Sequence, residues 1–223
     1  MSSERSILPA VLLALTAVTG IVDAISYLAL GHVFTANMTG NVVFIAFAVA
    51  GTPGLSAVRG GLALLAFITG AVLGGRLARR TSVGPSFRWA GAAFGAEATL
   101  LVAATVITIG YDSGLLDPTR LYGVIVLIGL AMGIRIAAIR KLGVPDLITI
   151  VLTLTIAGLA ADSSLAGGTN PRWWRRLGSI ASMAAGAAAG AWLLRYSIAL
   201  PLALCGAVSG ICAAVVYFDK GER

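Results

Sequence analysis

The residues best suited to chemistry in this chain are hydrogen-bonding side chains set within apolar sequence. Four of them lie in the stretch GHVFTANMTGNVVFIAFAVAG at 31–51, and three more lie in LITIVLTLTIAG at 147–158. Amide and hydroxyl groups can bind a solute or ion, or they can join membrane helices by hydrogen bonds. We expect a substrate- or ion-binding role for Asn37, Thr39 and Asn41 and, with the joining role favoured, for Thr149, Thr153 and Thr155.

Two carboxylates also lie deep inside apolar runs. Asp23 belongs to the run at 8–30, and Glu97 belongs to the run at 89–110. A charge at membrane depth is costly, so such a group faces a cavity, pairs with another group or carries protons. We predict that Asp23 binds substrate or couples an ion or proton. Glu97 is a weaker candidate for proton coupling, the alternative being a neutral glutamate bonded to a neighbouring helix.

The composition is that of a membrane protein. Hydrophobic residues make up 58% of the 223, charged residues make up 11%, and the mean hydropathy is +0.95. Soluble domains carry about 25% charged residues. The net charge of +7 does not indicate nucleic-acid binding, because the basic residues lie between apolar runs. A single histidine, His32, and the lack of a CxxC motif argue against a zinc site. Cys205 and Cys212 lie on one face of one run, which predicts core positions. We expect no metal, cofactor or catalytic residue.

Eight apolar runs predict an all-α integral membrane fold, and two of the runs are short. They cover 8–30, 37–50, 56–78, 89–110, 119–139, 147–161, 174–195 and 198–218. As helices, the second and sixth runs would extend only about 21–22 Å, whereas the hydrocarbon core is about 30 Å thick. We therefore expect six transmembrane helices plus two short re-entrant or discontinuous helices.

The distribution of positive charge supports this topology. If all eight runs cross, eight basic residues fall on each side. If the two short runs return to the side they came from, thirteen lie with the termini and three, Arg59, Arg120 and Arg195, lie opposite. The positive-inside rule then places both termini in the cytoplasm. On this interpretation Arg135, Arg140 and Lys141 are orientation charges near a helix end, and Trp89, Trp173 and Trp174 anchor the interfaces.

An internal repeat at an offset of 113–116 residues predicts two inverted halves within a single membrane domain, 1–223. Matching positions include Gly20 with Gly133, Gly70 and Gly74 with Gly186 and Gly190, and Gly91 and Gly95 with Gly206 and Gly210. The two repeats cover about 8–110 and 119–218. Three crossings in each half make the halves inverted, which is a common plan among transporters. The two short helices then point their N-termini at each other near the centre, where N–H groups favour an anion or a solute oxygen.

The stretches VDAISYLALGHVFTANMTGN and RKLGVPDLITIVLTLTIAGLAAD resemble the YoaK-type bacterial membrane proteins of the DUF1275 family, over nearly the whole chain. The resemblance implies a bacterial inner-membrane protein of uncharacterised function, often guessed to be a permease. The family pattern implies a polar residue at position 136 and a glycine at position 154. This chain has Ile136 and Leu154 there, so the second half is expected to contribute less to a site.

Three functions are compatible with these features. The first is a transporter or channel for a small solute with a site at the membrane midplane. The second is a non-transporting scaffold or partner subunit, suggested by the many glycines. The third is an intramembrane enzyme, which we rank last because the chain offers no nucleophile–base pair. The predicted partners are the lipid bilayer and a small solute or ion, not nucleic acid, and the sequence leaves a homo-oligomer open.

Overall fold

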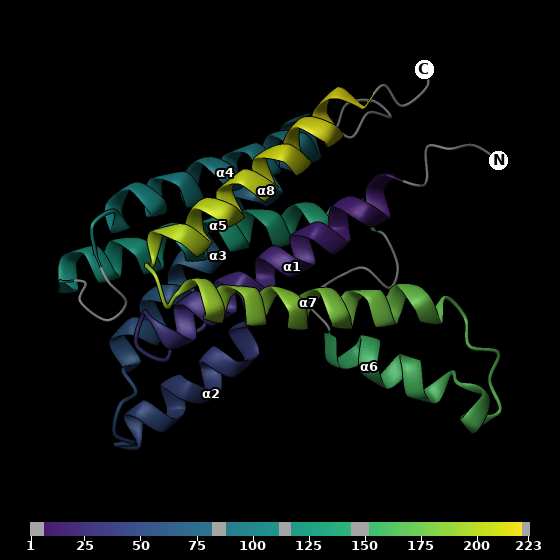
Figure 1. Cartoon of the computed structure of the whole chain (residues 1–223), viewed down its shortest axis with the longest axis horizontal. Helices are drawn as coiled ribbons and strands as arrows, with labels where there is room; N and C mark the ends of the chain where they lie inside the picture. Colours follow the sequence, from purple (N-terminus) through teal and green to yellow (C-terminus); the bar gives the residue numbers. More distant parts are fainter. Residues whose placement is uncertain (1–6, 82–87, 112–116, 144–151, 220–223) are drawn as a thin grey trace.

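Helices make up all the regular structure in the part of the chain that the computed structural model describes, which is residues 7–81, 88–111, 117–143 and 152–219. The order is α1 (Ile7–Leu28), α2 (Met38–Val49), α3 (Ala57–Thr81), α4 (Arg88–Thr108), α5 (Pro118–Leu142), α6 (Leu152–Ala161), a 3-10 turn η3 (Ser164–Ala166), α7 (Trp173–Leu193) and α8 (Ala199–Phe218). Each of the eight predicted runs therefore contains a helix. The long helices lie side by side, and the start of α1 and the end of α8 are at the same end of the molecule (Figure 1).

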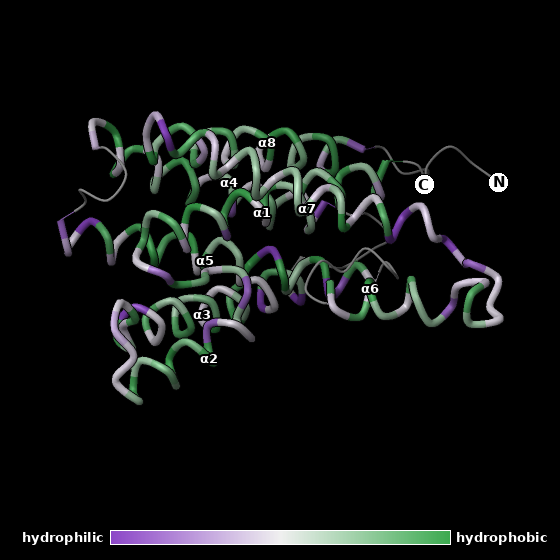
Figure 2. The backbone as a smooth tube through the Cα atoms, turned by 60° about the horizontal axis from the view of Figure 1, so that its bottom comes forward, coloured by the Kyte–Doolittle hydropathy of each residue, from purple (hydrophilic) through white to green (hydrophobic). Residues whose placement is uncertain are grey.

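Length and composition identify five of these helices as candidate membrane spans, namely α1, α3, α4, α5 and α8. Apolar residues cover most of their length, and many of the hydrophilic residues lie in the turns at the two ends (Figure 2). The 21-residue α7 is long enough to cross but is not among the five, since Arg175 and Arg176 in its first turn and the glycines and serines along it lower its hydropathy. The chain is thus an all-helical, multi-pass membrane protein with two shorter apolar helices, α2 and α6.

Local sequence signals set the ends of several helices. Asp117 caps α5, where its carboxylate accepts hydrogen bonds from the backbone N–H groups of the first turn, and Pro118 follows at the first helical position. Gly143 ends α5 in the left-handed conformation at φ 62°. At α2, the Asn37 side chain accepts a hydrogen bond from the backbone N–H of Gly40. The helix of the short second run therefore begins at its polar residues, as the sequence predicted.

Glycines bring α1 and α7 into backbone contact. A Cβ atom built on Gly186 would lie 2.0 Å from the carbonyl oxygen of Ala17, and one on Gly190 would lie 3.0 Å from the Cα of Ile21. Gly20 on α1 meets α7 in the same way, with its virtual Cβ 2.2 Å from the carbonyl oxygen of Met183. Residues later in α1 meet residues later in α7, so the two helices run in the same direction.

The same arrangement joins α3 to α5. A Cβ atom on Gly70 would lie 2.2 Å from the carbonyl oxygen of Leu130, and one on Gly74 would lie 2.8 Å from that of Ile134. From α5, the virtual Cβ of Gly133 lies 2.1 Å from the carbonyl oxygen of Phe67. α3 and α5 therefore also run in the same direction, and small residues allow the close approach.

α4 and α8 pack in opposite directions. Gly91 near the start of α4 meets Tyr217 near the end of α8, and Gly206 near the start of α8 meets Val102 in the second half of α4. Gly206 lies 115 residues after Gly91, and Val102 lies 115 residues before Tyr217. The α4–α8 pair is thus symmetric, with the helices interchanged.

Contacts between two further pairs of helices complete the directions of the long helices. At one end of α5, Lys141 lies over the ring of Trp89 at the start of α4, so these helices are antiparallel. The thiol of Cys205 lies 3.9 Å from the carbonyl oxygen of Val18, and that of Cys212 lies 4.0 Å from the one of Val11, so α1 and α8 are antiparallel. Hence α1, α4 and α7 run one way, and α3, α5 and α8 run the other way.

The two short helices bridge long helices that meet at one end of the bundle. α2 lies between the end of α1 and the start of α3, which are at the same end. α6 lies between the end of α5 and the start of α7, which are at the opposite end. Both short helices begin near the middle of the molecule and run outward to opposite ends (Figure 1). Each packs on the long helix that follows it, α2 on α3 and α6 on α7.

Candidate functional site

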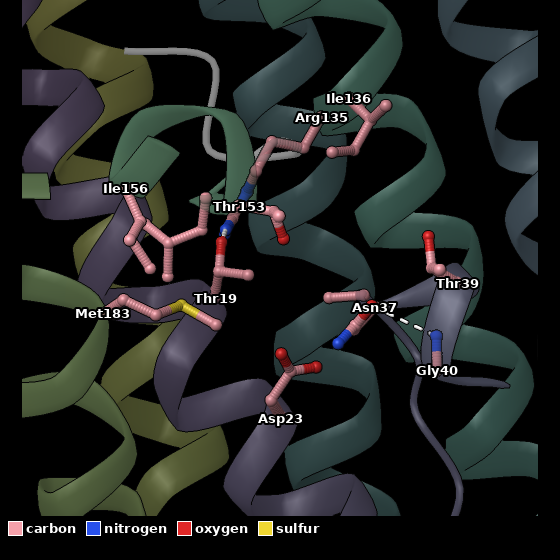
Figure 3. Close-up of a pocket in the computed structure, with 12 residues that line it drawn as sticks. Thr19, Asp23, Asn37, Thr39, Gly40, Arg135, Ile136, Thr153, Ile156 and Met183 are labelled. Atoms are coloured by element: carbon pink, nitrogen blue, oxygen red, sulfur yellow. Dashed lines mark hydrogen bonds between the residues drawn. The ribbon is translucent and has the colours of Figure 1, made fainter. Parts of the chain in front are cut away.

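A cavity of about 360 Å³ lies in the middle of the molecule, where the first turns of α2 and α6 meet α1, α5 and α7 (Figure 3). Its polar lining comprises Thr19, Asp23, Asn37, Thr39, Arg135 and Thr153. Ile136, Ile156 and Met183 contribute apolar side chains. Segments distant in sequence therefore converge on one site, with both short helices present.

The α2 side of the cavity is a helix N-terminus with its cap. Asn37 precedes α2 with non-helical backbone angles, and its Oδ1 atom accepts from the Gly40 N–H at 3.4 Å. Thr39, in the first turn, also lines the cavity. A helix N-terminus carries a partial positive charge and N–H groups without intrahelical partners. This wall therefore suits an oxygen acceptor.

α6 contributes its first turn to the same cavity. Leu152, Thr153 and Ile156 line the cavity, and Thr153 supplies the hydroxyl group on this side. α6 is 10 residues long and α2 is 12 residues long. The two first turns approach the cavity from the two ends of the bundle, because the helices run outward in opposite directions (Figure 1).

Asp23 is the acidic group that the described part of the chain contributes to the cavity. It lies within α1 and is only 8% exposed. Its Oδ1 atom is buried and has no hydrogen-bond partner among the described residues. The backbone N–H groups of Ala36 and Asn37, just before α2, face the carboxylate. A buried carboxylate oxygen without a partner is costly, and such groups call for a ligand, water or a proton.

Arg135 lines the cavity but is bound on its other sides. It is 1% exposed and forms an ion pair with Glu97 of α4, which is fully buried. The Nε atom donates to Glu97 Oε2 at 2.8 Å, and Nη2 donates to Oε1. Nη1 donates to the carbonyl oxygen of Leu15 and to Thr19 Oγ1. The prediction that Arg135 is an orientation charge near a helix end is wrong, because four helices enclose it.

Comparison with known proteins gives one family. The family described as "Protein of unknown function (DUF1275)" matches residues 11–216. The chain belongs to this family. The "UPF0700 transmembrane protein YoaK" of Bacillus subtilis (strain 168) is 35% identical over 153 residues, which cover 69% of this chain and 65% of the relative. The matched region thus spans just under two thirds of that relative's length. No solved structure matches the chain.

For this DUF1275 family member, the structure brings together four of the predicted site residues, Asp23, Asn37, Thr39 and Thr153. Asn41 lies elsewhere, since it is fully buried and donates through Nδ2 to the carbonyl oxygen of Gly60 at 2.9 Å. Its Oδ1 atom accepts from the backbone N–H of Phe34. Asn41 thus holds α2 against α3 and against its own entry loop.

The remaining predicted positions are distributed as follows. Thr155 is half-buried in α6 and does not line the cavity. Thr149 lies outside the described residues. Glu97 reaches the cavity only through Arg135. The hydroxyl group of Ser209 on α8 also donates a hydrogen bond to Glu97 Oε1, at 2.5 Å. The proposed role of Glu97 in proton coupling stays a prediction.

Sequence reasoning missed Thr19 and Arg135 in this DUF1275 protein. Thr19 precedes Asp23 by four residues, so the helical period places both on one face of α1. Arg135 precedes Ile136, the residue that the internal repeat aligns with Asp23. Both signals were present in the sequence. The interpretation of Trp89 as an interface anchor also needs correction, because Trp89 is buried against α5, unlike the exposed Trp173 and Trp174.

Proposed function

We propose that this protein is a transporter or channel for a small solute, with its binding site at the membrane midplane between the first turns of α2 and α6. The observation that carries the proposal is the central cavity, in which two outward-running short helices meet the buried carboxylate of Asp23, whose Oδ1 atom accepts no hydrogen bond from a described residue. Irregular backbone at membrane depth is tolerated where protein buries it or where it lines a cavity. Broken or short helices around a central site are a recurrent plan in transporters.

The proposal includes six crossings, with α2 and α6 re-entrant from opposite faces. The directions of the long helices support it, because α1 and α3 meet at one end and α5 and α7 meet at the other end. Removing the buried Arg135 from the count of orientation charges leaves twelve basic residues on the side of the termini. The three on the other side are Arg59, Arg120 and Arg195. We infer a bacterial inner-membrane location with both termini in the cytoplasm.

The proposal also treats the two halves, about 8–110 and 119–218, as inverted repeats within one domain. Equivalent contacts support this. The Gly91–Tyr217 contact corresponds to the Gly206–Val102 contact, because Gly206 lies 115 residues after Gly91 and Val102 lies 115 residues before Tyr217. Likewise, α3 packs on α5 as α7 packs on α1, through glycines in matching positions. An antiparallel α4–α8 pair is what a two-fold axis in the membrane plane produces.

Cysteine labelling tests the topology. In a background with Cys205 and Cys212 replaced by alanine, we expect Thr52→Cys and Tyr111→Cys to react with a membrane-impermeant thiol reagent in intact cells. Thr52 follows α2 and Tyr111 follows α4, and both positions are on the outer side if the short helices are re-entrant. Asn170→Cys, before α7, should react only after permeabilisation. Protection of Thr52→Cys and Tyr111→Cys in intact cells would indicate eight crossings and remove the re-entrant site.

Solute flux tests the site. The purified protein in liposomes should speed the osmotic response to at least one of guanidinium chloride, urea, glycine, glycerol and sodium nitrate, measured by light scattering. Asp23→Asn and Asn37→Ala should slow this flux by about tenfold or more, since each removes a polar group of the cavity lining. Asn37→Ser keeps the helix cap and separates capping from binding. Asp117→Asn removes a carboxylate outside the cavity and serves as the control. Unchanged flux in both cavity variants would remove the site.

The alternative of a non-transporting scaffold rests on the glycine-rich helix faces. Most of these glycines are used inside the chain, where they join α1 to α7, α3 to α5 and α4 to α8. The scaffold hypothesis also predicts no cavity, which the central site opposes. Stable co-purification with another protein, without flux, would favour it. We propose no enzymatic activity and no metal cofactor, and within the described ranges no group of three metal-ligating side chains occurs.

A further inference from the structure

The charge of the central cavity restricts what it can bind. Two charged side chains line it within the described part of the chain, Asp23 and Arg135. Glu97 neutralises Arg135 from the far side of the guanidinium group. Asp23 has no described ion-pair partner, and its buried Oδ1 atom accepts no hydrogen bond from any described residue. The cavity therefore carries one uncompensated carboxylate.

Arg135 cannot turn to serve as the partner of Asp23 or of an anionic solute. A guanidinium group has five N–H donors. Those of Arg135 point to both Glu97 oxygens, to the carbonyl oxygen of Leu15, to Thr19 Oγ1 and, at 3.4 Å, to Ser209 Oγ. A new contact would leave the buried Glu97 without its ion-pair partner, which is strongly unfavourable.

The first turn of α2 acts on a different part of an occupant. A helix N-terminus attracts an oxygen acceptor, but it supplies a partial charge of about half a unit and its effect fades within one turn. At α2, Asn37 already accepts from the first turn, and the backbone N–H groups of Ala36 and Asn37 face Asp23. Asp23 therefore dominates the charge that a solute meets on the α1 side.

We propose that the cavity selects a small solute with a cationic head group rich in N–H donors, such as an ammonium or guanidinium group, and that this group binds the carboxylate of Asp23. The inference rests on the proposed function, since it names the substrate class of the same site. Hydrogen bonds between charged groups are the strong ones, and the partly desolvated setting strengthens them. A volume of about 360 Å³ is near the lower end for ligand sites, so the occupant is small.

The experiment uses three planar probes of similar size that differ in charge. These are guanidinium, urea and nitrate, each titrated at constant ionic strength against the purified full-length protein in detergent. Binding is measured as the rise in unfolding temperature followed by tryptophan fluorescence at millimolar probe, well below the molar range in which guanidinium and urea denature, because a ligand that binds only the folded state stabilises it. We expect guanidinium to bind about tenfold or more tightly than urea, as one charge-assisted interaction predicts. Nitrate should give no shift.

Two charge-removing variants locate the binding. Asp23→Asn keeps the shape of the side chain and should abolish the preference for guanidinium over urea. Asp117→Asn removes the same charge from the exposed cap of α5, where asparagine is also a good capping residue, and should leave the preference unchanged. Both variants should fold, and their unfolding temperatures without probe serve as the reference.

The outcomes separate this inference from the transport proposal. A preference for guanidinium that Asp23→Asn removes supports the inference, whether or not the liposomes show flux. Absence of flux would refute the transport proposal alone. Equal or tighter binding of nitrate or urea overturns it, and so does a guanidinium shift that Asp23→Asn leaves intact. Flux of urea or nitrate without guanidinium binding would refute the cationic class and keep the transporter. No shift with any of the three probes also overturns the inference.

Discussion

Glu97→Leu is expected to lower the free energy of unfolding by about 3–5 kcal/mol, the typical cost of leaving a buried charge without its partner. The substitution removes both carboxylate oxygens that pair with Arg135, while Arg135 stays 1% exposed among four helices. Chemical or thermal unfolding in detergent measures the loss. A change below about 1 kcal/mol, the range of exposed pairs, would mean that the buried pair does not hold the bundle together.

The double variant Glu97→Leu with Arg135→Met separates the pair from the charge that it leaves behind. Apolar replacements of similar volume often restore or raise stability, so the double variant should recover most of the loss. Arg120→Met is the matched control, since it breaks the exposed pair with Asp117 and should cost less than about 1 kcal/mol. If the double variant is as unstable as Glu97→Leu, the hydrogen bonds of Arg135 to Leu15 and Thr19 contribute more than the ion pair.

The second large effect is expected at the glycine contacts. Gly70→Ala and Gly186→Ala each place a Cβ atom about 2 Å from a backbone carbonyl oxygen of the facing helix, far inside van der Waals contact. The helices must separate, and we expect each variant to lose about 1–3 kcal/mol or more of stability. Equal losses are expected, because the two residues occupy matching positions in α3 and α7. The same unfolding measurement in detergent tests this.

Gly75→Ala provides the control on α3. A Cβ at Gly75 meets nothing within 4 Å, so alanine should be neutral or stabilising by up to about 1 kcal/mol through helix propensity. If Gly75→Ala destabilises as much as Gly70→Ala, the loss reflects glycine content and not the close packing of α3 on α5. A large loss in Gly70→Ala with none in Gly186→Ala would show that the two halves are not equivalent.

Most helices of this fold could be predicted from apolar length, and the cavity could be predicted in outline. The polar cluster at 35–41 identified the start of α2, because asparagine is both a helix cap and a hydrogen-bonding group. The two short runs could be recognised from length alone, since they are too short for a straight crossing. Their meeting point then followed from the direction of each helix.

The different roles of Asn37, which lines the cavity, and Asn41, which joins α2 to α3, could not be predicted. Asn37 and Asn41 are four residues apart, but Asn37 precedes α2 with non-helical backbone angles, so the helical period does not relate the two side chains. The Glu97–Arg135 pair was missed for a different reason. The residues are 38 positions apart on antiparallel helices, and an arginine near the end of an apolar run is equally compatible with the membrane surface.

The buried ion pair crosses the boundary between the two halves of the chain, with Glu97 on α4 and Arg135 on α5. An assembly of two identical first halves would bring two glutamates to the centre and no arginine, while two second halves would bring two arginines and no glutamate. Neither assembly would be electrically balanced in the bilayer. The two parts of the chain therefore complement each other, because each supplies the charge that the other lacks at the centre of the bundle.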